Sequence, residues 1–156
     1  VSTYMVYQEG IYVGYRYYDK AEMDVQFPFG YGLSYTKFEY TDARILEKND
    51  DTIKVSVNVK NIGDRAGIEK TQIYAQYSDS RTYTPNFQLC GIKSTNLEAG
   101  ETQNVTIDID TYWIKAVLED GQRVTPDGKI TLYIGGHQPD KVSNELLGYE
   151  CEKIEL

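Results

Sequence analysis

The sequence predicts an all-β fold, an immunoglobulin/fibronectin type III-like antiparallel β-sandwich of about seven strands with an extended aromatic N-terminal arm. Three observations support this prediction. Apolar and polar residues alternate with a period of two in several short segments after residue 35, as in strands that bury one face. Turn-forming residues separate these segments at short intervals, as in sandwiches of this kind. Strands do not alternate with helices, which argues against a parallel sheet.

The predicted strands follow one another along most of the chain. In order they lie at residues 38–45, 53–59, 71–76, 88–93, 105–109 and 130–134, and a hairpin joins 117–118 to 123–124 across an Asp-Gly turn. The clearest is 53–59, where four β-branched residues alternate with Lys54, Ser56 and Asn58. A short helical turn is expected at 110–117. The tail, 142–156, is ambiguous, and its apolar residues could pack back on the sandwich.

The first 34 residues differ from the rest in composition. Nine of the fifteen tyrosines lie between residues 4 and 40, without a clear period and with too much glycine for a helix. We therefore expect an extended arm with a turn at 27–32, and an arm this aromatic must cover a surface. The predicted division is a Tyr-rich arm at 1–34 and a sandwich at 35–156. The first residues do not resemble a signal peptide, and the chain reads like a cut made inside a longer protein.

Length and charge exclude several classes of protein. With 156 residues the chain is too short for a (β/α)8 barrel, and no apolar run approaches a membrane span. The net charge of −8 argues against nucleic acid and anionic membranes as partners, because both need clustered cations. The two cysteines, Cys90 and Cys151, do not make a disulfide scaffold. Two unpaired thiols favour a reducing compartment, so we expect a cytoplasmic location.

Few residues suggest catalysis or metal binding. His137 is the single histidine, so any serine or cysteine triad would need it, and an ordinary loop histidine is expected instead. The cysteines are too far apart in sequence for a C-x-x-C zinc pair, and no calcium-binding loop is present. Among the carboxylates Glu9 is the most interesting, although an ion pair with Arg16 is at least as good an explanation. We expect no catalytic residue, no metal and no cofactor.

Four aromatic residues are candidates for contact with a carbohydrate or with another domain. Tyr83 and Phe87 flank a proline in a long loop, and Tyr112 and Trp113 follow a predicted strand. A carbohydrate-binding module would place two or three such rings coplanar on one face. The alternative is a structural role, because the single tryptophan of a small sandwich usually packs inside.

Two long segments, residues 9–19 (EGIYVGYRYYD) and 27–36 (FPFGYGLSYT), have a distinctive sequence. They resemble the C-terminal part of glycoside hydrolase family 3 enzymes, which include β-glucosidases, β-xylosidases and related enzymes. Residues 57–67 resemble the V-x-N-x-G-x-x-x-G turn of the family's fibronectin type III-like domain. Three further segments, 84–93, 97–101 and 135–140, fit the same domain, so the resemblance covers nearly the whole chain.

The resemblance implies a role without catalysis. Family members have a (β/α)8 barrel with an aspartate nucleophile, an α/β sandwich domain that usually supplies the acid/base, and an accessory fibronectin-like domain. The motifs around both catalytic residues have no counterpart here. The resemblance therefore implies a scaffolding domain attached to the end of the α/β domain, with the barrel and α/β domains of a parent β-glycosidase as partners. An independent carbohydrate-binding module and an exported immunoglobulin-like domain are the alternatives. Glucosidase or xylosidase specificity stays open.

Overall fold

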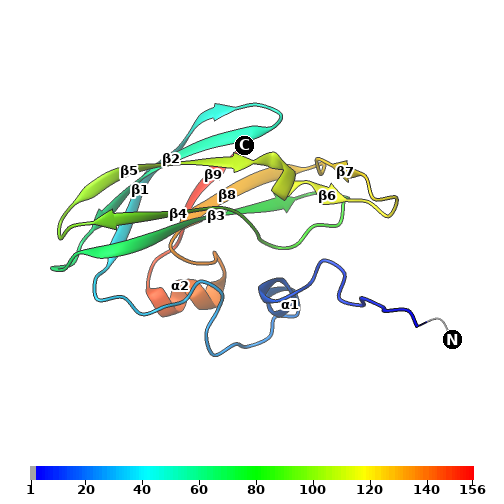
Figure 1. Ribbon diagram of the computed structural model, residues 1–156, viewed down its shortest axis with the longest axis horizontal. Helices are drawn as coiled ribbons and strands as arrows, with labels where there is room; N and C mark the ends of the chain where they lie inside the picture. Colours follow the sequence, from blue (N-terminus) through cyan, green and yellow to red (C-terminus); the bar gives the residue numbers. More distant parts are fainter. Residues whose placement is uncertain (1–2) are drawn as a thin grey trace.

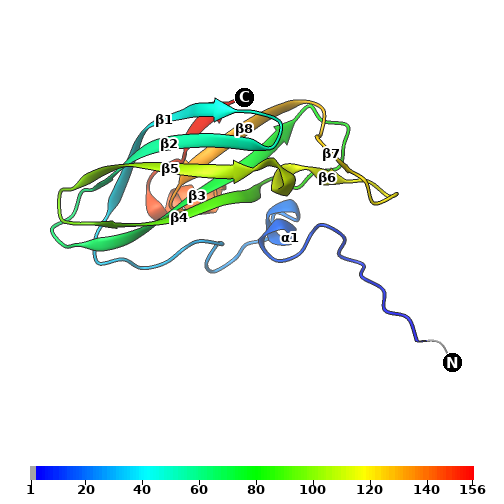
Figure 2. The ribbon, with the colours of Figure 1, turned by 45° about the horizontal axis from the view of Figure 1, so that its top comes forward.

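Two antiparallel sheets pack face to face in the computed structural model, which describes residues 3–156 (Figure 1). One sheet has the strand order β1 (Phe38–Lys48), β2 (Thr52–Asn61) and β5 (Thr102–Asp110). The other has the order β4 (Gln88–Leu97), β3 (Gly67–Ser78), β8 (Lys129–Gly135) and β9 (Glu152–Glu155). A separate small hairpin pairs β6 (Ala116–Val117) with β7 (Arg123–Val124). The predicted all-β sandwich is confirmed, and Figure 2 shows the three-stranded sheet lying over the four-stranded one.

The alternating patterns of β2 and β5 coincide in register. The residues opposite each other on the two strands are Ile53 with Ile109, Val55 with Ile107, and Val57 with Val105. All six side chains are buried in the core between the sheets. Burying one such side chain contributes roughly 1.5–3 kcal/mol, so the match between the two strands fixes their register.

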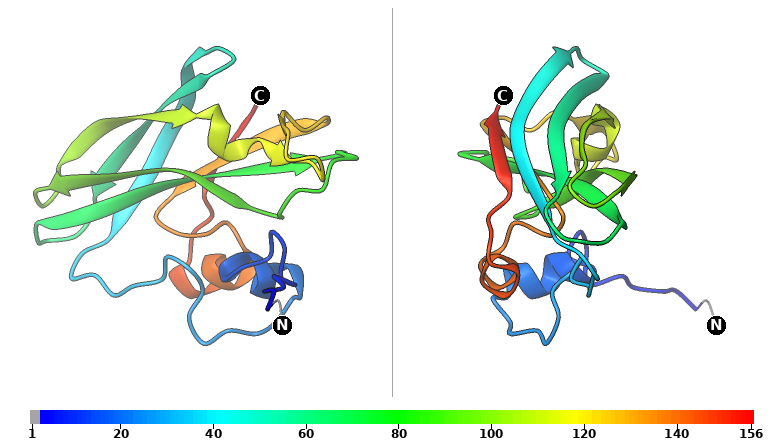
Figure 3. Two further views of the ribbon diagram at one scale, coloured as in Figure 1. Left: turned by 45° about the vertical axis from the view of Figure 1, so that its right-hand side comes forward. Right: turned by 90° about the vertical axis from the view of Figure 1, so that its left-hand side faces the viewer.

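Strand β3 is buried on both faces at its centre, where a half-buried strand was expected. Ile73 and Ala75 face the core, whereas Gln72 and Tyr74 lie on the opposite face and are also buried. The cover comes from the N-terminal arm and from the segment after β8. Figure 3 shows α1 (Tyr15–Lys20) and α2 (Lys141–Leu147) outside the sandwich, on this side.

The arm is not extended throughout, and our expectation that its glycines exclude a helix was wrong. Helix α1 forms because Gly14 lies just before the helix, at a φ of 62°, and leaves the helical residues free of glycine. The turn expected at 27–32 is present, with the Tyr31 amide donating to the Pro28 carbonyl at 3.1 Å. Val1 and Ser2 of the predicted 1–34 arm lie outside the described residues.

The tail packs back on the sandwich. Asp140 begins α2 because its side chain accepts a hydrogen bond from the Ser143 amide at 3.0 Å, and Gly148 ends the helix in the left-handed conformation. Strand β9 then pairs with β8, where Ile154 lies opposite Leu132.

The helical turn expected at 110–117 is confirmed as the 3-10 helix η1 (Thr111–Ile114), and the Asp110 side chain caps it. Within residues 3–156, no helix has the length and apolar character that a membrane span requires.

Candidate functional site

The N-terminal arm carries a large exposed apolar surface, which we call the arm surface. Two of its members, Leu33 and Tyr35, are 93% and 89% exposed. Its exposed apolar residues are Tyr4, Met5, Val6, Tyr7, Val13, Tyr17, Tyr18, Met23, Phe27, Phe29, Leu33 and Tyr35. Surfaces of this extent on soluble domains mark sites of interaction.

Tyr15 anchors the arm to the four-stranded sheet. Its hydroxyl accepts a hydrogen bond from the backbone amide of Leu89 in β4, at 3.0 Å. Its ring stacks on Phe29, with centroids 4.7 Å apart, and meets the buried Tyr74 ring edge-on. Helix α1 therefore packs one tyrosine inward, while Tyr17 and Tyr18 remain on the arm surface.

A hydrogen-bond network lies below this anchor. The Tyr74 hydroxyl donates to the Gln72 side-chain carbonyl at 2.7 Å, and the Gln72 amide donates to the Gly136 carbonyl at 3.0 Å. The arm passes directly over Gln72 at Gly30, where a β-carbon would lie 3.1 Å from the Gln72 amide atoms and φ is +86°. Glycine at this position thus allows the arm to lie close against β3.

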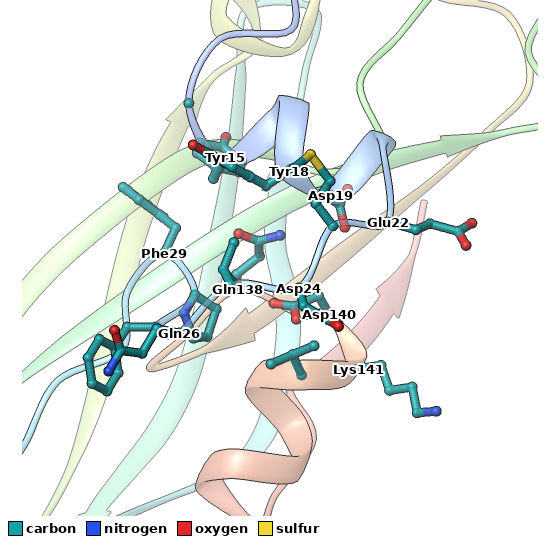
Figure 4. Close-up of a pocket in the computed structure, with 16 residues that line it drawn as sticks. Tyr15, Tyr18, Asp19, Glu22, Asp24, Gln26, Phe29, Gln138, Asp140 and Lys141 are labelled. Carbon is teal, nitrogen blue, oxygen red and sulfur yellow. The ribbon is translucent and has the colours of Figure 1, made fainter.

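An open hollow of about 860 Å³ separates the arm from α2 (Figure 4). Its lining combines aromatic side chains of the arm with four carboxylates, Asp19, Glu22, Asp24 and Asp140. Burial raises the pKa of Asp19, and the charge of Asp140 raises it further, against the effect of a hydrogen bond from Asn86. Among residues 3–156, no group of three or more His, Cys, Asp or Glu side chains is arranged to hold a metal ion.

The rings of Tyr83 and Phe87 each pack against another ring of this chain. The Tyr83 ring meets Tyr12 of the arm at 5.3 Å and 90°, and the Phe87 ring meets Tyr133 of β8 at 5.5 Å and 86°. Both contacts are edge-on, so neither pair offers a flat stacking surface.

Trp113 is 60% exposed, so our expectation that the single tryptophan packs in the core was wrong. Its ring is nearly perpendicular to that of Tyr112, at 87°, and the Arg123 guanidinium lies 3.9 Å from the centre of the Tyr112 ring. These four aromatic residues do not form one coplanar surface. Carbohydrate or domain contact at Tyr83, Phe87, Tyr112 and Trp113 stays a prediction.

The loop that carries Tyr83 is held by a residue that the sequence showed only as part of a turn. Asp127 accepts hydrogen bonds from the Ser80 hydroxyl and the Arg81 amide, both at 3.0 Å, and from the Arg81 side chain at 2.8 Å. These partners hold the pKa of Asp127 well below its usual range. Sequence spacing does not reveal this link, because the partners lie more than forty residues apart.

The histidine and the two thiols that a nucleophilic mechanism would use are withdrawn from the surface. His137 lies in the loop after β8, as expected, but it is fully buried: its ring packs edge-on against Tyr149, and its Nδ1 lies 2.7 Å from the Gln138 carbonyl. Burial raises the pKa of the Cys90 and Cys151 thiols to about 12, which keeps both in the poorly nucleophilic protonated form.

Glu9 is exposed at the surface of the arm. Arg16 donates to the Ile11 carbonyl at 3.4 Å, and within residues 3–156 no ion pair joins it to Glu9.

A half-buried carboxyl group joins the two sheets. Tyr40 of β1 donates its hydroxyl hydrogen to Glu69 of β3 at 2.5 Å, and Tyr149 stacks on the Tyr40 ring. Burial raises the pKa of Glu69 above its ordinary value of 4.5, in spite of the Tyr40 hydrogen bond, which lowers it. The folded state therefore favours the protonated carboxyl.

Replacing Glu69 by glutamine is expected to stabilise the domain at pH 7 and to have no such effect at about pH 4. A carboxyl group whose pKa is raised in the folded state stabilises the fold at pH values below its ordinary pKa. This stabilisation is lost as the pH rises through the raised pKa. Glutamine keeps the acceptor for Tyr40 and removes the buried charge. Urea unfolding midpoints at both pH values measure the effect, with exposed Glu155→Gln as control. A Glu69→Gln variant less stable than the parent at pH 7 would contradict this account.

Comparison with known proteins assigns the sandwich to a family. Residues 69–138 match the fibronectin type III-like domain family. Residues 69–138 therefore belong to a fibronectin type III-like domain. The matched residues run from β3 through β8 to Gln138 and include the loop with Tyr83 and Phe87.

The relatives of this fibronectin type III-like domain confirm the resemblance to family 3 glycoside hydrolases. It is 47% identical over 107 residues to a β-glucosidase of Kluyveromyces marxianus, a match covering 68% of the chain and 12% of that protein. It is 32% identical over 152 residues to β-glucosidase B of Emericella nidulans, covering 95% of the chain and 18% of that protein. The crystal structure of DesR, a β-glucosidase from Streptomyces venezuelae in complex with D-glucose, matches with a TM-score of 0.81 and 31% identity over 96% of the chain and 18% of DesR.

The chain therefore spans less than a fifth of the length of these relatives. The second match extends over 95% of the chain, so it includes most of the arm as well as the sandwich.

Proposed function

We propose that this chain is a non-catalytic accessory domain that steadies the catalytic domains of a family 3 β-glycosidase. The observation that carries the proposal is the arm surface: Tyr15 fixes the arm to the sandwich, yet Leu33 and Tyr35 remain almost fully exposed. Apolar groups held in fixed positions at a surface gain free energy when a partner buries them. The proposed partners are the barrel and α/β domains that the resemblance to family 3 implies, and the much greater length of the β-glucosidase relatives supports their presence in a parent enzyme.

The first described residues favour an α/β domain as the nearest partner. Tyr4, Met5, Val6 and Tyr7 are consecutive apolar residues, all of them exposed. In Figure 2 this segment extends away from the sandwich without pairing with either sheet. Strands of parallel sheets are buried on both faces and contain such uninterrupted apolar runs. This segment therefore suits insertion into the sheet of a neighbouring α/β domain.

Catalysis by the chain itself is disfavoured by the chemistry of the hollow. A glycosidase needs two carboxyl groups facing a bound sugar, one of them with a raised pKa. Asp19 and Asp140 come closest to this requirement. Both Asp140 oxygens, however, accept hydrogen bonds from Ser143 in the cap of α2.

Two measurements test the proposal. The chain alone should release no 4-nitrophenol from 4-nitrophenyl β-D-glucopyranoside or β-D-xylopyranoside. Hydrolysis that disappears in Asp19→Asn would overturn the accessory role. In the full-length gene product, Leu33→Ser with Tyr35→Ser should lower the melting temperature by several degrees and reduce activity, because about 2 kcal/mol of burial is lost at each site.

The same double substitution should leave the unfolding of the chain alone unchanged, since both side chains are exposed there. Leu46→Ser, at a half-exposed position on β1, is the matched control in the full-length protein. A full-length protein unaffected by the arm substitutions would remove the proposed interface.

A further inference from the structure

The hollow between α1 and α2 has the features of a site whose occupant comes from another molecule or domain. The arm forms one side of it through α1 and residues 22–29, and residues 138–142 form the other (Figure 4). Residues distant in sequence thus line one space of about 860 Å³.

The negative charge of the hollow has no compensating cation. Among residues 3–156, none of the carboxylates lining it forms a salt bridge. Lys141 at its rim points away in Figure 4, and its Nζ lies 3.7 Å from Glu145 instead. Burial is the main reason why the pKa of Asp19 is raised, and repulsion by the charge of Asp140 adds to it. A cation between them would remove that repulsion.

An amide side chain also faces the hollow. Gln138 is only 3% exposed and lines the hollow, and its side chain lies between the two helices in Figure 4. Its side-chain amide is not among the buried polar atoms of residues 3–156 that lack a partner, so it keeps access to the hollow. An amide oxygen in this position can accept a hydrogen bond from a ligand that donates hydrogen bonds.

The remaining walls are aromatic and favour a planar cation. Tyr15, Tyr18, Phe27 and Phe29 all line the hollow. A guanidinium group stacks on such rings and carries five donors, enough to reach carboxylates and an amide on different elements. The chain already makes one contact of this kind, where Arg123 lies 3.9 Å from the centre of the Tyr112 ring.

We propose that this hollow is the docking site for an arginine side chain of the neighbouring catalytic domain. Asp19 and Asp140 receive the charge, Gln138 accepts a further hydrogen bond, and the aromatic walls hold the plane of the guanidinium. The inference rests on the proposed function, because that function supplies the neighbouring domain. An ammonium group fits less well, since it is a compact charge that cannot stack as a plane.

Nuclear magnetic resonance on the ¹⁵N-labelled chain tests this site, with N-acetyl-L-arginine methylamide as the probe. Saturable shifts are expected for the Gln138 side-chain amide and the α1 backbone. The uncharged isostere N-acetyl-L-citrulline methylamide should bind at least fivefold more weakly. The arginine probe should also bind at least fivefold more weakly to the Asp19→Asn/Asp140→Asn variant, in which asparagine at position 140 still caps α2. Asp64→Asn, at an exposed turn, should bind like the parent chain.

Equal shifts with arginine and citrulline would overturn the inference. So would shifts of the same resonances by cellobiose but not by arginine, which would indicate a sugar site. The proposed function has a separate readout in the Leu33 and Tyr35 substitutions. If these substitutions lower the melting temperature of the full-length protein while the arginine probe does not bind, the proposed docking site is wrong and the proposed accessory role is retained.

Discussion

Replacing Asn61 by alanine is expected to cost about 4 kcal/mol of unfolding free energy, because four hydrogen bonds of a fully buried amide are lost together. The Asn61 side-chain oxygen accepts from the Thr36 hydroxyl at 2.5 Å and the Gly63 amide at 3.1 Å. Its nitrogen donates to the carbonyls of Arg65 at 2.7 Å and Leu97 at 3.2 Å. Alanine removes all four bonds, and two of the partners, Thr36 and Leu97, are themselves buried and have little access to water.

Urea unfolding of the chain measures this effect, and Asn104→Ala is the matched control. Asn104 is exposed on β5 and donates one side-chain hydrogen bond to Asn58, so its loss should cost less than about 1 kcal/mol. Similar unfolding midpoints for the two variants would show that the Asn61 network does not hold the end of β2 as described.

Replacing Tyr15 by alanine is expected to release the arm from the sandwich, with a local cost of about 3 kcal/mol. The variant loses the stack on Phe29, the edge contact with Tyr74 and the acceptor for the Leu89 amide. The sandwich core stays intact because its residues lie between the sheets, away from the arm.

Hydrogen exchange of the Leu89 amide reports this release, since Tyr15 is its acceptor. Exchange should accelerate roughly a hundredfold in Tyr15→Ala, in keeping with a local loss of about 3 kcal/mol. Tyr17→Ala removes a neighbouring ring that is 50% exposed and should leave the Leu89 exchange unchanged. Protection retained in Tyr15→Ala would mean that other contacts hold the arm.

The strands that could be predicted from the sequence are those with one face on the core. In β2 and β5 burial depends only on which face a residue occupies, so the alternation of valine and isoleucine with polar residues is a sufficient signal. At Gln72 and Tyr74 this signal fails, because Gly30 and Tyr15, more than forty residues earlier, cover the second face.

The candidate site could be predicted only in part. Composition alone predicts that the aromatic arm covers a surface, on its own domain or on a neighbour, and the structure adds that much of it is exposed on this chain. The hollow could not be predicted, because it depends on α1, which the glycine content had argued against, and on the approach of Asp140 to Asp19. The exposure of Trp113 could not be predicted either. This residue lies outside the alternating segments, so no sequence period indicates whether it faces the core or the surface.

The short edge strand β9 affects how the domain associates at high protein concentration. This strand is the outer edge of its sheet, and its unpaired backbone groups would accept a strand from a second copy. Lys153 and Glu155 are exposed on this short edge, and parallel in-register stacking of copies would bring like charges together. Fibre growth from this edge is therefore disfavoured, even when the domain is produced at high concentration.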